Sequence, residues 1–100
     1  MNVIKLPHKF IGTGDVKGFE FKRIKESENA YMYAVSDNGT MHYEVFYKKS
    51  YPVCIDFDNR IYSDNDTKEV YPKSKFFGKE AWCIRNINKA KDKFYSISNE

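Results

Sequence analysis

The sequence predicts a single α+β domain over residues 1–100, with a small antiparallel sheet of about five strands and one C-terminal helix packed on one face. Three observations support this prediction. Residues 30–47 alternate large and smaller side chains on both sides of Asp37-Asn38-Gly39, which is typical of a β-hairpin. Aromatic residues make up 17% of the chain, with eight Tyr and eight Phe, which favours strands. Near the C-terminus, apolar residues recur with helical spacing.

The central hairpin can pair in two registers. A two-residue Asn38-Gly39 loop places Tyr31, Tyr33 and Val35 opposite even-numbered residues, and a three-residue loop places them opposite odd-numbered ones. The three-residue loop gathers the large apolar residues on one face and puts Gly39 last, where such a loop needs left-handed backbone. We predict the three-residue loop, because a slip of one residue would scatter that face. The predicted core face comprises Tyr31, Tyr33, Val35, Met41, Tyr43, Val45 and Tyr47.

Further strands are predicted on both sides of the hairpin, in a meander with one buried face. Residues 19–24 alternate apolar and polar side chains, as a half-buried strand does. Pro52 begins another strand over 52–57, and Asp58-Asn59 can turn it back into a short strand at 60–62. Residues 63–67 are predicted to form a polar loop.

The C-terminal segment allows two interpretations. One is a single long helix that includes residues 81–84, and the other is a strand at 81–84 followed by a helix capped by Asn86. The second explains more, because Asn is a preferred helix cap and stands directly before the apolar stripe. We predict this strand and helix, with the helix covering the Tyr-rich sheet face. The stripe comprises Ile87, Ala90, Phe94 and Ile97.

Composition indicates a folded cytoplasmic protein. Hydrophobic residues make up 41% and charged residues 31% of the chain, which is ordinary for a folded domain. Cys54 and Cys83 do not form a disulfide framework and are predicted to be reduced, small residues in or near the core. Residues 1–7 contain no apolar stretch of signal-peptide length, and no window approaches a membrane span. We therefore expect no membrane association.

Charge is distributed unevenly along the chain, which carries a net charge of +3. Residues 52–70 carry an excess of acidic groups, and residues 71–100 carry an excess of Lys and Arg. These regions can neutralise each other across the fold, because surfaces of mixed sign are normal. Alternatively, the basic C-terminal third meets an anionic partner.

No catalytic, metal or cofactor site is predicted. The glycines of residues 12–18 lack the spacing of a phosphate-binding loop. Asp64-Asn65-Asp66 resembles the start of a calcium loop, but the Gly at the sixth position and the Glu at the twelfth position of such a loop are absent. His8 and His42 are far apart in sequence, whereas zinc sites need three or four convergent ligands. His42 is expected on the outer face beside Glu44. We therefore predict a non-enzymatic protein without cofactors, and identify no small-molecule substrate.

The stretch from Tyr71 to Lys79 is the most site-like part of the chain, because lysines alternate with aromatic residues in an irregular loop. Phe76 and Phe77 are either plugs into the core or an exposed apolar anchor with a basic rim. Lys48 and Lys49 have similar neighbours and could extend this surface. The predicted partner-binding residues are Tyr71, Lys73, Lys75, Phe76, Phe77, Lys79, Lys48 and Lys49.

Enrichment in Tyr, Lys, Asn and Ile resembles the composition of small proteins from AT-rich bacteria and their mobile elements. This resemblance is one of composition and transfers no residues and no activity. We predict an accessory protein that binds a protein partner, with self-association through a sheet edge as a further possibility. The alternative is nucleic-acid binding through the basic, aromatic surface.

Overall fold

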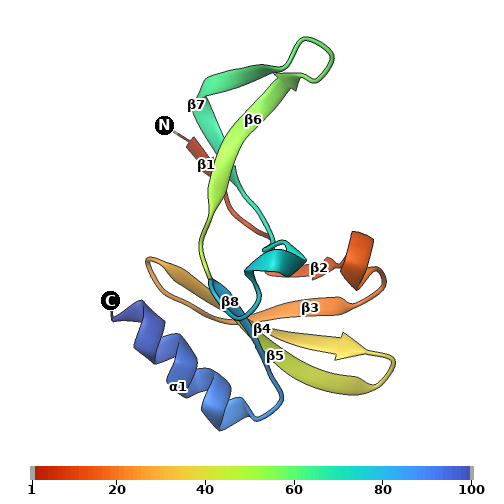
Figure 1. The fold of residues 1–100 in the computed structure, drawn as a ribbon, viewed down its shortest axis with the longest axis vertical. Helices are drawn as coiled ribbons and strands as arrows, with labels where there is room; N and C mark the ends of the chain where they lie inside the picture. The colour runs from red at the N-terminus through yellow and green to blue at the C-terminus, as the bar shows by residue number, and fades with distance from the viewer. Residues whose placement is uncertain (1, 100) are drawn as a thin grey trace. The chain divides into compact units, whose positions relative to one another are not determined.

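The computed structural model describes residues 2–99, which form eight strands, two short 3-10 turns and one α-helix (Figure 1). The strands are β1 (Asn2–Ile4), β2 (Lys9–Ile11), β3 (Glu20–Glu26), β4 (Ala30–Asp37), β5 (Thr40–Tyr47), β6 (Ser50–Asp56), β7 (Ile61–Glu69) and β8 (Ala81–Ile84). The turns are η1 (Gly14–Val16) and η2 (Ser74–Phe76), and the helix is α1 (Ile87–Ser98). None of the helices within this described range is long and apolar enough to cross a membrane.

The elements divide into two compact units, each described by itself. One unit holds β1, β6 and β7, and we call it the β6–β7 unit. The other holds β2 to β5, β8 and α1, and we call it the helix-bearing unit. That residues 1–100 form a single domain stays a prediction.

The helix-bearing unit contains a five-stranded sheet in the order β2-β3-β4-β5-β8, with every neighbouring pair antiparallel. An antiparallel sheet with one C-terminal helix confirms the predicted α+β class. Strands β2 to β5 follow one another as a meander, as predicted. The strand beside β5 is β8, however, and the strand predicted over 52–57 belongs to the other sheet.

The predicted three-residue hairpin loop is wrong. Tyr31 pairs with Phe46, and Asp37 pairs with Thr40, which leaves Asn38 and Gly39 as a two-residue loop. Both loop residues have positive φ, 49° and 87°, as a type I′ turn requires. Asn and Gly are the residues that adopt this backbone most readily, so the local turn chemistry determined the register.

The predicted core face is therefore divided between the two faces of the sheet. Tyr31, Tyr33 and Val35 share one face, which we call the aromatic face, with their partners on β5. Tyr43, Val45 and Tyr47 point to the opposite face. Met41 was also assigned to the core face, but it is 49% exposed.

Helix α1 packs on the second of these faces, not on the aromatic face. The cluster beneath it contains Ala30, Met32 and Val45 from the sheet and Ala90, Phe94 and Ile97 from the helix. The prediction that α1 covers Tyr31 and Tyr33 is therefore wrong. Tyr31, Tyr33 and Phe46 are nevertheless fully buried, so strand β4 is buried on both faces. Aromatic contacts pack this face, with Tyr33 and Phe46 stacked at 5.8 Å between ring centroids.

The predicted β8 and α1 are confirmed. The Asn86 side chain caps the helix, because its Oδ1 accepts hydrogen bonds from the backbone N–H of Asn88 at 2.9 Å and of Lys89 at 3.1 Å. Ala90, Phe94 and Ile97 of the predicted stripe are buried, while Ile87 in the first turn is 38% exposed.

The β6–β7 unit is a three-stranded sheet in the order β1-β7-β6, in which β1 runs parallel to β7 and β6 runs antiparallel to it. The polar loop predicted at 63–67 is wrong, because β7 continues from Ile61 to Glu69. β7 is the middle strand of this sheet: residues 66–68 pair with β1, and both ends of β7 pair with β6. Cys54 in this unit and Cys83 on β8 are both exposed, so the predicted core positions of the cysteines are also wrong.

Candidate functional site

The predicted aromatic and basic loop leads from β7 to β8 and contains η2. Its side chains Lys73, Lys75 and Lys79 are exposed, whereas Phe76 and Phe77 are half-buried. The Lys75 ammonium nitrogen lies 5.2 Å from the centroid of the Phe76 ring. The two Phe rings are therefore neither deep plugs nor fully exposed anchors.

The remaining predicted residues Tyr71, Lys48 and Lys49 belong to the β6–β7 unit, whereas Lys73 to Lys79 belong to the helix-bearing unit. All three are half-buried. That these eight residues form one partner-binding surface stays a prediction.

The largest display of exposed apolar side chains in the described residues lies on the β6–β7 unit. Phe57 in the turn is 85% exposed, and Ile55 just before it is 67% exposed. Among the residues of this unit whose burial is described, Leu6 and Glu69 are the buried ones. The other large exposed residues, at 45–51%, are Val3, Ile4, Tyr51, Ile61 and Tyr62.

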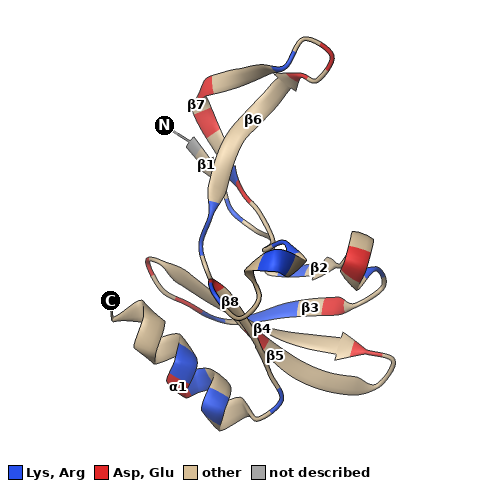
Figure 2. Ribbon diagram, viewed as in Figure 1, with Lys and Arg blue, Asp and Glu red and all other residues tan. Residues whose placement is uncertain are grey.

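The turn between β6 and β7 is ordered by one carboxylate and is acidic. Asp56 accepts hydrogen bonds from the backbone N–H groups of Asp58 and Asn59 and from the Asn59 side chain. These bonds, led by the one from the Asn59 side chain, hold the pKa of Asp56 below its ordinary value. With Asp58, Asp64 and Arg60 close by in sequence, acidic residues outnumber basic ones around the turn, as Figure 2 shows.

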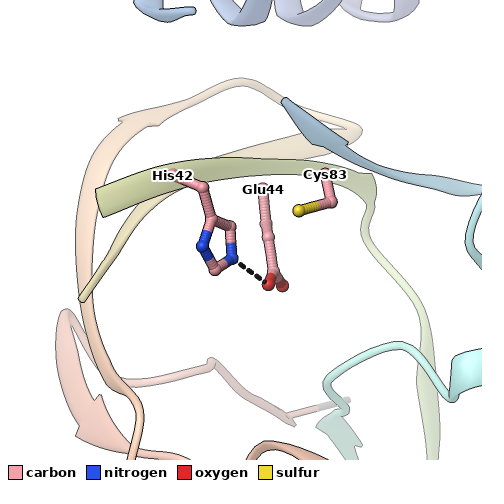
Figure 3. Close-up of side chains that lie close together, drawn as sticks. All are labelled: His42, Glu44 and Cys83. Atoms are coloured by element: carbon pink, nitrogen blue, oxygen red, sulfur yellow. Dashed lines mark hydrogen bonds and ion pairs between the residues drawn. The ribbon is translucent and has the colours of Figure 1, made fainter. Parts of the chain in front are cut away.

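A second cluster lies in the helix-bearing unit, where His42, Glu44 and Cys83 come together (Figure 3). His42 and Glu44 are two residues apart on β5, so their side chains share a face of the strand. Cys83 stands directly opposite Glu44 across the β5–β8 pairing. Their ligand atoms, one nitrogen, one oxygen and one sulfur, all lie within 4.8 Å of one another. The cluster is on the aromatic face, opposite the face that packs against α1.

The three side chains differ in their surroundings. Glu44 is only 3% exposed, and its Oε2 lies 2.9 Å from Nε2 of His42, which is a hydrogen bond or ion pair according to the protonation of the imidazole. The ring of Phe19 lies edge-on to His42, with 6.4 Å between centroids. Cys83 is on the edge strand β8 and is exposed, which leaves the cluster open on that side.

The thiol of Cys83 is not set up as a nucleophile. Desolvation of the sulfur, followed by the nearby Glu44 carboxylate, raises the pKa of Cys83, and Arg85 only partly offsets this. Reactive cysteines instead need a lowered pKa, because the thiolate is the attacking species. The arrangement is better suited to holding a positively charged ligand than to covalent catalysis.

The sequence indicated only part of this cluster. Alternation along the strand placed His42 beside Glu44, and the structure confirms that they are neighbours. The predicted outer face is wrong, however, because Glu44 is buried and His42 is half-buried on the aromatic face. Cys83 was missed because only the pairing of β5 with β8 brings it to them. The strand predicted at 81–84 contains Cys83, and pairing that strand with β5 would have placed Cys83 opposite Glu44.

Comparisons with known proteins gave no match. No family model matches the chain, and no curated protein or solved structure matches it either. Function is therefore inferred from the chemistry of the described residues.

Proposed function

We propose that this protein is a non-enzymatic binding module whose β6–β7 unit docks onto the apolar surface of another protein. The observation that carries this proposal is the exposure of Ile55 and Phe57, at 67% and 85%, on a sheet with little apolar burial. A three-stranded sheet normally stabilises itself by burying an apolar face. Here that apolar area is available to a partner.

The energy available from such docking is substantial. Fully burying a Phe or Ile side chain contributes about 1.5–3 kcal/mol. Aromatic anchors near the centre of an interface commonly dominate its affinity. Phe57 is the most exposed of the large apolar side chains described, and its place in the turn makes it the natural anchor.

The features of this unit favour a different protein over a second copy of the chain. Strand β6 is an edge strand, but Pro52 within it has no N–H to donate to an added strand. Two acidic turns brought together by symmetry would repel each other. The expected partner therefore presents an apolar groove with a basic margin.

Nucleic-acid binding stays the second prediction. Lysines of the chain itself lie against three aromatic rings of the helix-bearing unit. The ammonium nitrogen of Lys93 is 4.1 Å from the centroid of the Trp82 ring, and that of Lys25 is 5.4 Å from the centroid of the Tyr95 ring. The third ring is Phe76, under Lys75. A nucleobase would have to displace these ammonium groups before it could stack.

Site-specific photo-cross-linking in the native cell tests the proposal. We would replace Phe57 by p-benzoylphenylalanine and, as a matched control, replace Ile11 of the helix-bearing unit, which is 60% exposed. We expect a discrete cross-linked protein from position 57 and none from position 11. The captured protein, once purified, should bind the wild-type chain saturably and bind Phe57→Asp at least about tenfold more weakly, as expected for an anchor.

Three outcomes would contradict the proposal. Equal cross-linking from positions 57 and 11 would show that the cross-links are nonspecific. A cross-linked product that contains two copies of this chain would show self-association instead of binding to a different protein. Saturable DNA or RNA binding that weakens steeply with salt and is lost in Lys73→Ala/Lys75→Ala, without any protein cross-link, would put nucleic acid first.

A further inference from the structure

The cluster of His42, Glu44 and Cys83 gathers three metal-ligating side chains on regular sheet positions. His42 and Glu44 are held by the β4–β5 ladder, and Cys83 by the β5–β8 ladder. Ligands built on paired strands are positioned more precisely than ligands on loops. The backbone therefore keeps the three side chains together without help from a bound ion.

We propose that His42, Glu44 and Cys83 bind a zinc ion, with imidazole nitrogen, carboxylate oxygen and thiolate sulfur as its three protein ligands. Structural and catalytic zinc sites use these donor types. Three protein ligands leave one position of a tetrahedral ion for water. This site goes beyond the proposed docking function and does not depend on it.

The distances fit a zinc ion after small side-chain movements. Zinc bonds of about 2.0–2.3 Å place the ligand atoms of a tetrahedral site roughly 3.3–3.8 Å apart. The three ligand atoms here lie within 4.8 Å of one another, and the nitrogen and oxygen of the His42–Glu44 pair are 2.9 Å apart. The pair has to open slightly and the Cys83 sulfur has to approach, and the open edge of β8 gives the sulfur room to rotate.

The donor set selects among metal ions. Calcium and magnesium prefer oxygen ligands throughout, and this cluster offers a single carboxylate. Nitrogen and sulfur donors instead suit zinc and other borderline transition metals. A divalent ion would also add positive charge beside the buried Glu44 carboxylate, which the arrangement of its neighbours keeps at the cluster.

Binding has a defined proton balance. The Cys83 thiol loses its proton to solvent as the zinc–sulfur bond forms, because the thiolate is the ligand. His42 coordinates through Nε2 in the neutral tautomer that carries its proton on Nδ1. The charges of the Glu44 carboxylate and the Cys83 thiolate together balance the two positive charges of the ion.

Cobalt substitution tests the site directly, because a cobalt–thiolate bond gives a charge-transfer absorption that nitrogen and oxygen ligands do not. We would titrate the reduced full-length protein with Co²⁺, then displace the cobalt with Zn²⁺ and attempt displacement with Mg²⁺. The variants are Cys83→Ser and His42→Ala. The matched control is Cys54→Ser, which removes the second exposed cysteine of the chain, located in the β6–β7 unit. Circular dichroism of each variant checks that it is folded.

We expect one Co²⁺ per chain with the thiolate band, full displacement by Zn²⁺ and none by Mg²⁺. Cys83→Ser should lose the band, His42→Ala should weaken binding at least about tenfold, and Cys54→Ser should behave as wild type. The proposal is overturned by an absence of saturable binding, which would leave His42 and Glu44 as a plain buried pair. It is equally overturned if the band survives in Cys83→Ser, if it is lost in Cys54→Ser, or if folded His42→Ala binds with unchanged affinity.

Discussion

The β4–β5 hairpin and the β6–β7 hairpin contain similar apolar residues, but the first buries them and the second exposes them. In β4 and β5, aromatic and branched side chains are buried on both faces of a sheet, and Tyr31, Tyr33 and Phe46 are fully inaccessible. In β6 and β7, Ile55, Phe57 and other large apolar residues are exposed. Apolar content alone therefore does not separate a core from a contact surface; the difference lies in what the rest of the unit places over each strand.

The largest expected contrast is between two phenylalanines. Phe46→Ala removes a fully buried ring and should lower the free energy of unfolding by about 3–5 kcal/mol. Phe57→Ala removes a ring that is 85% exposed and should change it by no more than about 0.5 kcal/mol. Urea denaturation of both variants measures the difference. A loss of several kcal/mol in Phe57→Ala would show that this ring stabilises the fold, and the comparison would fail.

A smaller contrast concerns two residues at the start of helix α1, Asn86 and Asn88. Asn86 caps α1, so Asn86→Ala should lower the free energy of unfolding by about 1 kcal/mol. The control is Asn88→Ala, because Asn88 is the exposed second residue of the same helix. This substitution should leave the free energy of unfolding almost unchanged. Thermal unfolding followed by circular dichroism compares the two. Equal losses would indicate that general helix propensity, not the cap, is responsible.

The smallest expected effect is at Asp56, which accepts backbone hydrogen bonds in the turn between β6 and β7. The pKa of Asp56 is lowered, so its charged carboxylate stabilises the turn. This stabilisation is fully present above the ordinary carboxyl pKa of about 4 and is lost as the pH falls through the lowered pKa of Asp56. Asn59→Ala removes the main hydrogen bond and should raise the pKa of Asp56 towards its ordinary value. Carbon-detected NMR titration of the Asp56 carboxyl in the wild type and in Asn59→Ala measures this. An unchanged Asp56 pKa would contradict the hydrogen-bonded turn.

Local signals in the sequence predicted much of the fold. Alternation located β3, β4 and β5, and the cap at Asn86 with the stripe behind it located α1. The register of the central hairpin was mistaken because we assumed one buried face, and on a sheet buried on both faces alternation does not identify the register. The Asn38-Gly39 turn was the better guide.

Long-range pairing accounts for the remaining errors. The polar residues 63–67 lie within β7, where Asp66 and Thr67 pair with β1 and Thr67 also pairs with Pro52 of β6, and no local pattern reveals this pairing. Cys83 reaches His42 and Glu44 through the pairing of β5 with β8. The exposure of Ile55 and Phe57 was missed for the same reason, since alternation shows that a face is apolar but not whether anything covers it.

Native-state hydrogen exchange of the free protein tests the difference between the two hairpins most directly. We predict that amides of β4 and β5 exchange only with global unfolding, because both faces of the strands are packed. Amides of β6 and β7 should exchange much faster, through local opening, because little apolar burial holds that unit together. Protection of β6 and β7 equal to that of β4 and β5 would show that this hairpin has a stabilising core of its own, and would contradict the view that its apolar residues are available to a partner.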